Sequence, residues 1–170
     1  NSIHVEGFDV TANPPATAFQ ISGSDNAITD NYIHDMLQAV NGVNGKPVGD
    51  GATRDYSAAS HNRIAYNKVY HSEFGFILGG NDWMVEDNEV NRLFMYADPA
   101  KKNVDCDYSR FFGQGCVEQY NYFHGSTRDE IKTAHVDCLQ TFMDNGGLAA
   151  DLTFQFNTCF DFHQACMVES

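Results

Sequence analysis

The sequence predicts an all-β fold: a single-stranded right-handed parallel β-helix, a solenoid with coils of about 21 residues and loop insertions on one side. Three observations predict it. A short motif containing asparagine recurs along the chain, and the segments around it alternate apolar and polar residues with the period of β-strands. The chain is also rich in aromatic residues, with 13 Phe and 8 Tyr, which favours strands over a helical array.

The repeated motif is an apolar residue, two mostly polar residues, asparagine, any residue and a second apolar residue. Clear copies occur at 28–33, 64–69, 85–90 and 154–159. A further copy around Asn121 carries one additional residue before its asparagine, and we expect a β-bulge there. The five asparagines are separated by 36, 21, 33 and 36 residues, so we take 21 as the basic period and expect insertions of about 12 to 15 residues elsewhere.

A second, shorter strand supports this register. The segments 19–23 and 76–80 lie at the same distance from the next asparagine of the repeat. The final 14 residues align without gaps to 67–80, which sets Cys159 on Val69 and Cys166 on Phe76. Strands stacked about 4.8 Å apart would bury one apolar residue per coil at each inward position. The asparagine should adopt a left-handed backbone conformation at a turn, and stacked asparagines should form an amide ladder.

Composition limits the cellular context and the partners. The length fits one domain at 1–170, and the chain begins with Asn1 in a strand-like pattern, so we expect a processed product or a fragment of a longer chain. No apolar run is long enough to span a membrane. The net charge of −13 disfavours nucleic acid and anionic membranes. It would also repel an acidic polysaccharide unless a basic loop or a divalent cation reversed the local charge.

The insertions indicate where function would lie, because solenoids carry functional loops on one face. The first spans 41–60 and the second 96–114, and we place both after the second strand of their coils. A third has two parts, at 125–134 and 144–150. If the first two leave the solenoid at the same turn, they would wall a groove suited to an extended polymer.

The sharpest local signal is the segment 135–142, with the sequence HVDCLQTF. It resembles the His-x-Asp-Gly-Ile-Gln strands of right-handed β-helix proteins, with Cys138 in place of glycine. Together with the asparagine repeat, it makes the chain similar to the pectate-lyase-like superfamily, which includes polysaccharide lyases, glycoside hydrolases, epimerases and tailspikes. His135 and Asp137 lie two residues apart on a strand and could act as a base and its orienting partner, or bind a metal.

The resemblance implies a site chemistry. Lyases of this fold use acidic residues to hold calcium against a uronate carboxylate, and a Lys or Arg to remove the C5 proton. Candidate calcium ligands are Asp105, Asp107 and Asp129. The candidate catalytic residues are Arg110, Lys132, His135 and Asp137. The simpler interpretation, that these are polar residues of solvated loops, stays open, and no distinctive hydrolase pair is evident.

The five cysteines favour an oxidising compartment, and their odd number leaves at least one unpaired. Cys106 and Cys116 bracket the second insertion and are a candidate disulfide. Cys159 and Cys166 should pack as free, small apolar residues. Trp83 is expected in the core, whereas Tyr96, Tyr108 and Phe111 could present surface to a sugar.

Two functions follow as alternatives. The first is a secreted or cell-surface carbohydrate-active protein, a calcium-assisted polysaccharide lyase acting on an acidic glycan. The second is a non-catalytic surface or assembly module, such as an adhesin, tailspike or filament subunit, which would associate end to end through its open edges.

Overall fold

The computed structural model describes residues 2–42, 46–48, 53–55, 59–96, 105–142 and 149–169. Strands dominate this part of the chain, and its one helix is the short α1 (Arg128–Ile131). No helix among the described residues has the length and apolar character needed to cross a membrane.

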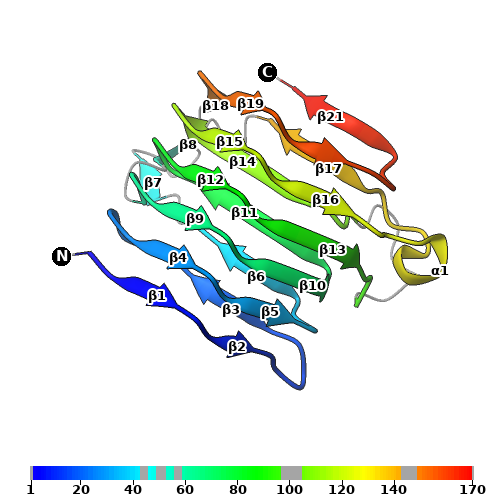
Figure 1. Ribbon diagram of the computed structural model, residues 1–170. Coiled ribbons are helices and arrows are strands. Elements are labelled where there is room, and N and C mark those ends of the chain that lie inside the picture. The colour runs from blue at the N-terminus through cyan, green and yellow to red at the C-terminus, as the bar shows by residue number, and fades with distance from the viewer. Residues whose placement is uncertain are drawn as a thin grey trace.

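Three parallel sheets, here called A, B and C, extend along the molecule from the N-terminal to the C-terminal end (Figure 1). Sheet A stacks β1 (His4–Glu6), β4 (Ala27–Thr29), β9 (Arg63–Ala65), β12 (Met84–Glu86), β15 (Val117–Gln119) and β19 (Thr153–Gln155). Sheet B stacks β2 (Asp9–Val10), β5 (Tyr32–His34), β10 (Lys68–Ser72), β13 (Glu89–Leu93), β16 (Tyr122–His124) and β20 (Thr158–Cys159).

Sheet C stacks β3 (Thr17–Gln20), β6 (Gln38–Asn41), β11 (Phe74–Gly79), β14 (Ser109–Gln114), β17 (Asp137–Thr141) and β21 (Gln164–Val168). The short β18 (Ala149–Ala150) also pairs with β14, and β7 (Lys46–Val48) forms an antiparallel pair with β8 (Thr53–Asp55). The chain passes through sheets A, B and C in that order and then repeats, an arrangement consistent with a parallel β-helix.

The register confirms the predicted stacking of like residues. In sheet B, one continuous column consists of Ile33, Val69, Val90, Phe123 and Cys159. Cys166 likewise joins the column of Phe76 in sheet C, as the alignment predicts. The side chains of the sheet B column and Phe76 belong to one core cluster between the sheets, where the stacked coils remove them from water.

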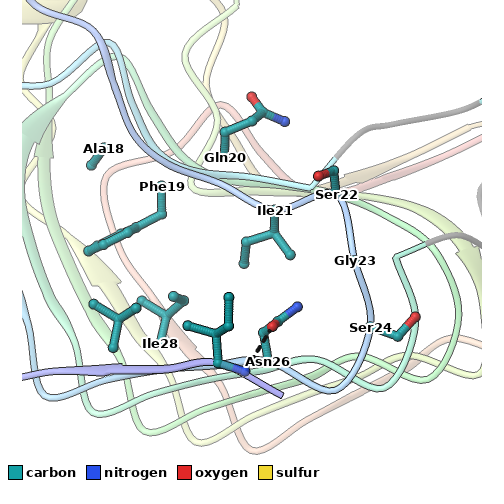
Figure 2. Close-up of a pocket in the computed structure, with 11 residues that line it drawn as sticks. Ala18, Phe19, Gln20, Ile21, Ser22, Gly23, Ser24, Asn26 and Ile28 are labelled. Atoms are coloured by element: carbon teal, nitrogen blue, oxygen red, sulfur yellow. Dashed lines mark hydrogen bonds between the residues drawn. The ribbon is translucent and has the colours of Figure 1, made fainter. Parts of the chain in front are cut away.

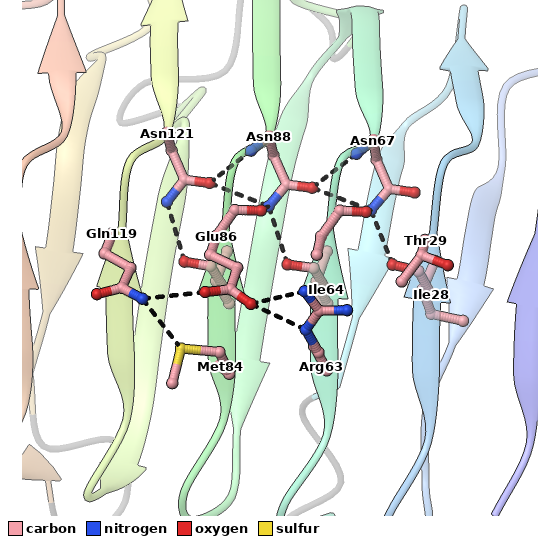
Figure 3. A network of polar contacts seen from close by, with 12 residues as sticks. Ile28, Thr29, Arg63, Ile64, Asn67, Met84, Glu86, Asn88, Gln119 and Asn121 are labelled. Carbon is pink, nitrogen blue, oxygen red and sulfur yellow. Dashed lines mark hydrogen bonds and ion pairs between the residues drawn. The ribbon is translucent and has the colours of Figure 1, made fainter.

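The predicted amide ladder is present between sheets A and B (Figure 3). The backbone N–H and the side-chain Nδ2 of Asn67 both donate to Oδ1 of Asn88, each at 3.0 Å, and Asn88 repeats this towards Asn121. Nδ2 of Asn88 also donates to the backbone carbonyl of Ile64 in the preceding coil, at 3.0 Å. Each buried amide in the middle of the ladder therefore uses both donors and both acceptor positions.

The left-handed residue of this turn is not the asparagine, as the sequence suggested, but the residue before it. Asp30, Tyr66, Asp87 and Tyr120 have φ between 54° and 60°. The asparagine itself must point its amide inwards along the stack, so the preceding residue makes the turn and carries its side chain outwards. Asp tolerates this conformation comparatively well, whereas Tyr at the same position is unusual.

The expected bulge before Asn121 is also wrong. Val117, Glu118 and Gln119 pair directly with Met84, Val85 and Glu86, with no additional residue. Glu118 therefore occupies the inward position that Ile28, Ile64 and Val85 fill in earlier coils. The motif is regular at this coil, and a carboxyl group replaces its inward apolar residue.

The predicted disulfide between Cys106 and Cys116 is not formed, because both cysteines are free and buried. Cys159 is not free as expected but bonds to Cys138, from sheet B to sheet C. Cys166 is free, and it is exposed. Trp83 lies in the core as predicted, whereas Tyr108 and Phe111 are fully buried and present no surface to a sugar.

The first two insertions do not leave the solenoid at the same turn. The first connects β6 of sheet C to β9 of sheet A, and the second connects β13 of sheet B to β14 of sheet C. The segment 125–134 shares the turn of the second insertion, and the segment after β17 shares the turn of the first. All of these insertions thus adjoin sheet C, at one or the other end of its strands.

Candidate functional site

The candidate site lies on the outer face of sheet C, where two successive coils meet. The backbone N–H of Cys106 donates to the carbonyl of His135 at 2.8 Å, and that of Tyr108 donates to the carbonyl of Asp137 at 3.1 Å. The segment before β14 therefore runs alongside the start of β17. This pairing brings Asp105, Asp107 and Arg110 beside His135 and Asp137, residues that are about one coil apart in the sequence.

Arg110 links the two carboxylates of its own coil. Its Nη2 donates to Asp105 at 3.1 Å and also to Asp107. Asp107 is fully buried, and its second carboxylate oxygen accepts the backbone N–H of Asp137 at 3.0 Å. Burial raises the pKa of Asp107 to about 6, and the positive charge of Arg110 partly opposes this rise.

His135 and Asp137 form the predicted pair. Nδ1 of His135 lies 3.2 Å from Oδ1 of Asp137, whose side chain is fully buried. Burial raises the pKa of Asp137, while the nearby His135 and Arg110 lower it. Because Asp137 approaches Nδ1, the imidazole presents Nε2 as its other nitrogen for chemistry.

Exposure separates the accessible groups from the supporting ones. The His135 and Asp105 side chains are 40% and 37% exposed, and that of Arg110 is 15% exposed. Asp107 and Asp137 have no exposed surface. A ligand on this face would therefore meet His135, Asp105 and the edge of Arg110, held in position by the two buried carboxyl groups.

An apolar cluster, mainly of aromatic rings, lies next to the charged groups. The guanidinium carbon of Arg110 lies 5.3 Å from the ring centre of Phe74 and 5.8 Å from that of Phe142. Phe142 also meets Phe112 edge to face at 5.0 Å, and Ile77 completes the cluster. Stacking between two rings restricts the guanidinium and favours recognition of a planar anion.

Two candidate residues lie apart from this cluster. The ammonium group of Lys132 lies 5.7 Å from the ring of Phe94, at the end of α1. Asp129 is exposed in the first turn of the same helix. Neither side chain contacts the Arg110 cluster among the described residues. Of the first insertion, residues 43–58 lie outside the part of the chain whose side chains are described, and so do residues 97–104 of the second insertion.

The donor set does not fit a calcium ion. Asp105 and Asp107 already direct carboxylate oxygens at Arg110, so their negative charge is compensated by a side chain. Asp129, the third expected ligand, is elsewhere on α1. Within the described ranges, no group of three or more His, Cys, Asp or Glu side chains is arranged to hold a metal ion.

The sequence did not identify His163 as a site residue. Its ring stacks on His135 with centres 5.2 Å apart, and its Nδ1 accepts the backbone N–H of Val136 at 2.9 Å. Burial lowers the pKa of His163, and the positive charge of Arg128 adds to the effect. The gapless alignment of the last 14 residues contained part of the signal, because it sets His163 on Glu73, just before a sheet C strand, but only the structure places it beside Val136.

A separate cavity lies away from this cluster. A pocket of about 410 Å³ lies at the N-terminal end of the core, where Phe19, Ile21 and Ile28 point into it (Figure 2). No ionisable side chain lines this pocket, so it offers no acid–base chemistry. Comparisons with protein-family models, curated proteins and solved structures found no match.

Proposed function

We propose that this protein cleaves an acidic polysaccharide by β-elimination on the outer face of sheet C. One observation carries the proposal: residues from two coils form a base with its orienting carboxylate, His135 and Asp137, beside a cation held between aromatic rings, Arg110. The similarity of the sequence to the pectate-lyase-like superfamily points to the same substrate class.

In the proposed reaction, Arg110 pairs with the carboxylate of a uronate residue. All hydrogen bonds from its guanidinium to described carboxylates come from Nη2, and Nε is buried, which leaves Nη1 for the substrate. This charge pairing acidifies the C5 proton, because it stabilises the negative charge that develops on the carboxylate. Here Arg110 takes the charge-neutralising role that the sequence resemblance gave to calcium.

Nε2 of His135 then takes the C5 proton. The C5–H electron pair forms the C4–C5 double bond as the C4–O bond breaks, and water protonates the leaving oxygen. Asp137, whose Oδ1 lies 3.2 Å from Nδ1, orients the imidazole for this step. Phe74 and Phe142 offer apolar ring surface against which a sugar can pack.

The handedness of the solenoid, its coil length and the location of the protein are further proposals. We infer a right-handed solenoid with a basic coil of 21 residues, supported by the direct pairing of Val69 with Val90 and by the strong preference of parallel connections for right-handed crossovers. We also infer an extracellular location, which the disulfide between Cys138 and Cys159 supports.

A panel assay tests the activity. The protein is incubated with uronate polymers of different linkage, with added calcium or with a chelator, while the ultraviolet absorbance of unsaturated products and the number of reducing ends are measured. β-elimination predicts that both signals rise together, and the Arg110 assignment predicts activity in the chelator. New reducing ends without absorbance would indicate hydrolysis instead, and no product from any polymer would remove the proposal.

Three substitutions test the residue roles. His135→Gln and Asp137→Asn should each lower kcat by 10² to 10⁴-fold, the usual contribution of a general base. Lys132→Met is the matched control, because this residue packs on Phe94 away from the cluster, and it should keep activity within about twofold. A large loss in Lys132→Met with normal activity in His135→Gln would contradict the assignment.

End-to-end association is the second candidate. Among the described residues, the edge strands of the three sheets are β1, β2 and β3 at one end and β19, β20 and β21 at the other. Such edges can pair with another chain. Sedimentation at increasing protein concentration tests this function, which predicts growing oligomers and is excluded by a constant monomer.

A further inference from the structure

Glu118 is a buried acid that the proposed reaction does not use. It lies on β15 in the inward column of sheet A, between Val85 and Phe154 of the adjacent coils, and is 1% exposed. Its Oε1 atom has no hydrogen-bond partner of normal geometry among the described residues. The hydroxyl of Ser109 lies close enough to lower the pKa of Glu118 against the larger effect of burial, but it also makes no hydrogen bond of normal geometry. Burying a carboxyl group without a partner is costly, which makes this position unusual for a core column.

A cavity adjoins this carboxyl group. It has a volume of about 280 Å³ and is formed by side chains of two successive coils. Phe123, Phe154 and Leu139 give it apolar walls, and the disulfide cysteines Cys138 and Cys159 also line it. The titratable groups that line it are Glu118 and the thiol of Cys166.

We propose that this cavity binds the ammonium group of a small organic amine, with Glu118 as its counter-ion. An alkylammonium ion supplies both the hydrogen-bond donors and the positive charge that the buried carboxylate lacks. Its alkyl chain fills the apolar part of the cavity, and the phenyl rings offer their negative faces to the cation.

The lining of the cavity disfavours a metal ion. Calcium and magnesium need six or more oxygen ligands, whereas this cavity offers a single carboxyl group among mainly apolar side chains. A neutral alcohol would fill the same volume but would leave the carboxyl group without a charged partner. The charge of the ligand therefore distinguishes this site from simple apolar filling.

Proton linkage supplies an independent signature. Burial raises the pKa of Glu118 to about 8, so the carboxyl group is mostly protonated at pH 7 and must ionise to pair with an ammonium ion. Alkylamines stay charged to about pH 10, as lysine does. The affinity should therefore be about tenfold higher at pH 9 than at pH 7, because the competent fraction of Glu118 rises by that factor.

The test is an NMR titration of the whole chain with n-butylammonium chloride at pH 7 and pH 9, with n-butanol and sodium chloride as controls. Binding of n-butylammonium at pH 9, at least tenfold weaker binding of n-butanol and the stated pH trend are expected. Glu118→Gln and Glu118→Leu should each weaken binding at least tenfold, and the leucine variant restores the apolar column if the glutamine variant folds poorly.

The proposal is overturned if n-butylammonium does not bind, if n-butanol binds equally well, or if both Glu118 variants keep the affinity of the original chain. It is also overturned if the affinity is the same at pH 7 and pH 9. These outcomes are independent of the polysaccharide assay, because the amine site lies between the coil of Glu118 and the coil of Phe154, whereas the proposed reaction takes place on the outer face of sheet C.

Discussion

Glu118 and Asp107 show how strongly position decides the chemistry of a carboxyl group. Both are buried, but Asp107 bonds to Arg110 and to a backbone N–H, whereas Oε1 of Glu118 has no described partner. The pKa values follow this difference, rising to about 6 for Asp107 and to about 8 for Glu118. Asp107 can therefore be ionised and pair with Arg110 near neutral pH, whereas Glu118 is mostly protonated at pH 7 unless a bound cation stabilises its charged form.

Replacement of Glu118 with leucine should stabilise the fold. Leucine matches the apolar residues Ile64 and Val85 of the same column and removes a buried polar atom without a partner. We expect the free energy of unfolding at pH 7 to rise by about 2 kcal/mol, the usual cost of such an atom. Urea denaturation measures this, and Glu89→Gln on the outer face of sheet B is the control. A loss of stability in Glu118→Leu would contradict the burial argument.

The pH dependence of stability should identify the same residue. The folded pKa of about 8 lies above the ordinary value of 4.5, so the folded state binds the proton more tightly than the unfolded state. Proton binding at Glu118 therefore contributes to the stability of the fold in full below pH 4.5, and this contribution is lost as the pH rises to about 8. The stability gain of Glu118→Leu over the original chain should grow between pH 5 and pH 9, measured without amines. A constant gain would show that Glu118 does not titrate in this range.

Among the elements, the strands are short, and the ladder between sheets A and B connects them along the whole molecule. Each asparagine side chain is hydrogen-bonded to both neighbouring coils. Removal of one asparagine side chain therefore removes hydrogen bonds from groups in both of those coils. The ladder is therefore a set of coupled contacts, and its stability depends on each coil keeping the same register.

Removal of one ladder amide should be costly. Asn88→Ala would remove the acceptor of the Asn67 backbone N–H and of one Nδ2 hydrogen of Asn67, and the side-chain donor to Oδ1 of Asn121, which would keep the backbone N–H of residue 88. We expect a loss of roughly 2–4 kcal/mol in the free energy of unfolding, measured by urea denaturation. The neighbouring exposed Asp87→Asn, which keeps a residue that tolerates the left-handed conformation, should change it by less than about 0.5 kcal/mol. Equal effects of the two substitutions would argue against the ladder as a stabilising element.

The sequence predicted these elements well because the repeat determines them locally. Spacing between asparagines was enough to place Val69, Val90 and Cys159 in one column. The prediction failed at the coil of Asn121, where the apolar residue of the motif is replaced by Glu118. A charged residue is rarely buried in a core, so we counted Glu118 as an inserted residue and expected a bulge. The left-handed conformation was assigned to the asparagine and not to the residue before it, because residue types alone do not show which residue of a two-residue turn adopts it.

For the whole molecule, the arrangement of the sheets decides which distant residues meet. Periodicity gives the residues of each column but not which columns face each other, so the bond between Cys138 in sheet C and Cys159 in sheet B was not predictable. For the same reason, the sequence did not show that the first two insertions leave the solenoid at different turns. The meeting of Asp105, Asp107 and Arg110 with His135 and Asp137 was expected as a common site, since one coil separates the two segments.

The cysteine pairing can be tested by alkylation. In the folded protein only the exposed Cys166 should react, and denaturation without a reductant should add Cys106 and Cys116, as mass spectrometry of the labelled peptides will show. Cys138→Ser should lower the free energy of unfolding by roughly 2–4 kcal/mol, because the bond restricts the unfolded chain. Cys166→Ser is the control with little effect. Protection of Cys106 and Cys116 in the denatured oxidised chain would contradict this pairing.

The asparagine ladder also gives the molecule a direction. From Asn67 to Asn157, every side-chain Oδ1 accepts from the asparagine of the preceding coil, so the small dipoles of these carbonyl groups all point the same way. Aligned dipoles add, as they do along a helix axis. The two ends of the stack are therefore electrically unlike, and any filament grown from this unit would be polar, with one end extending differently from the other.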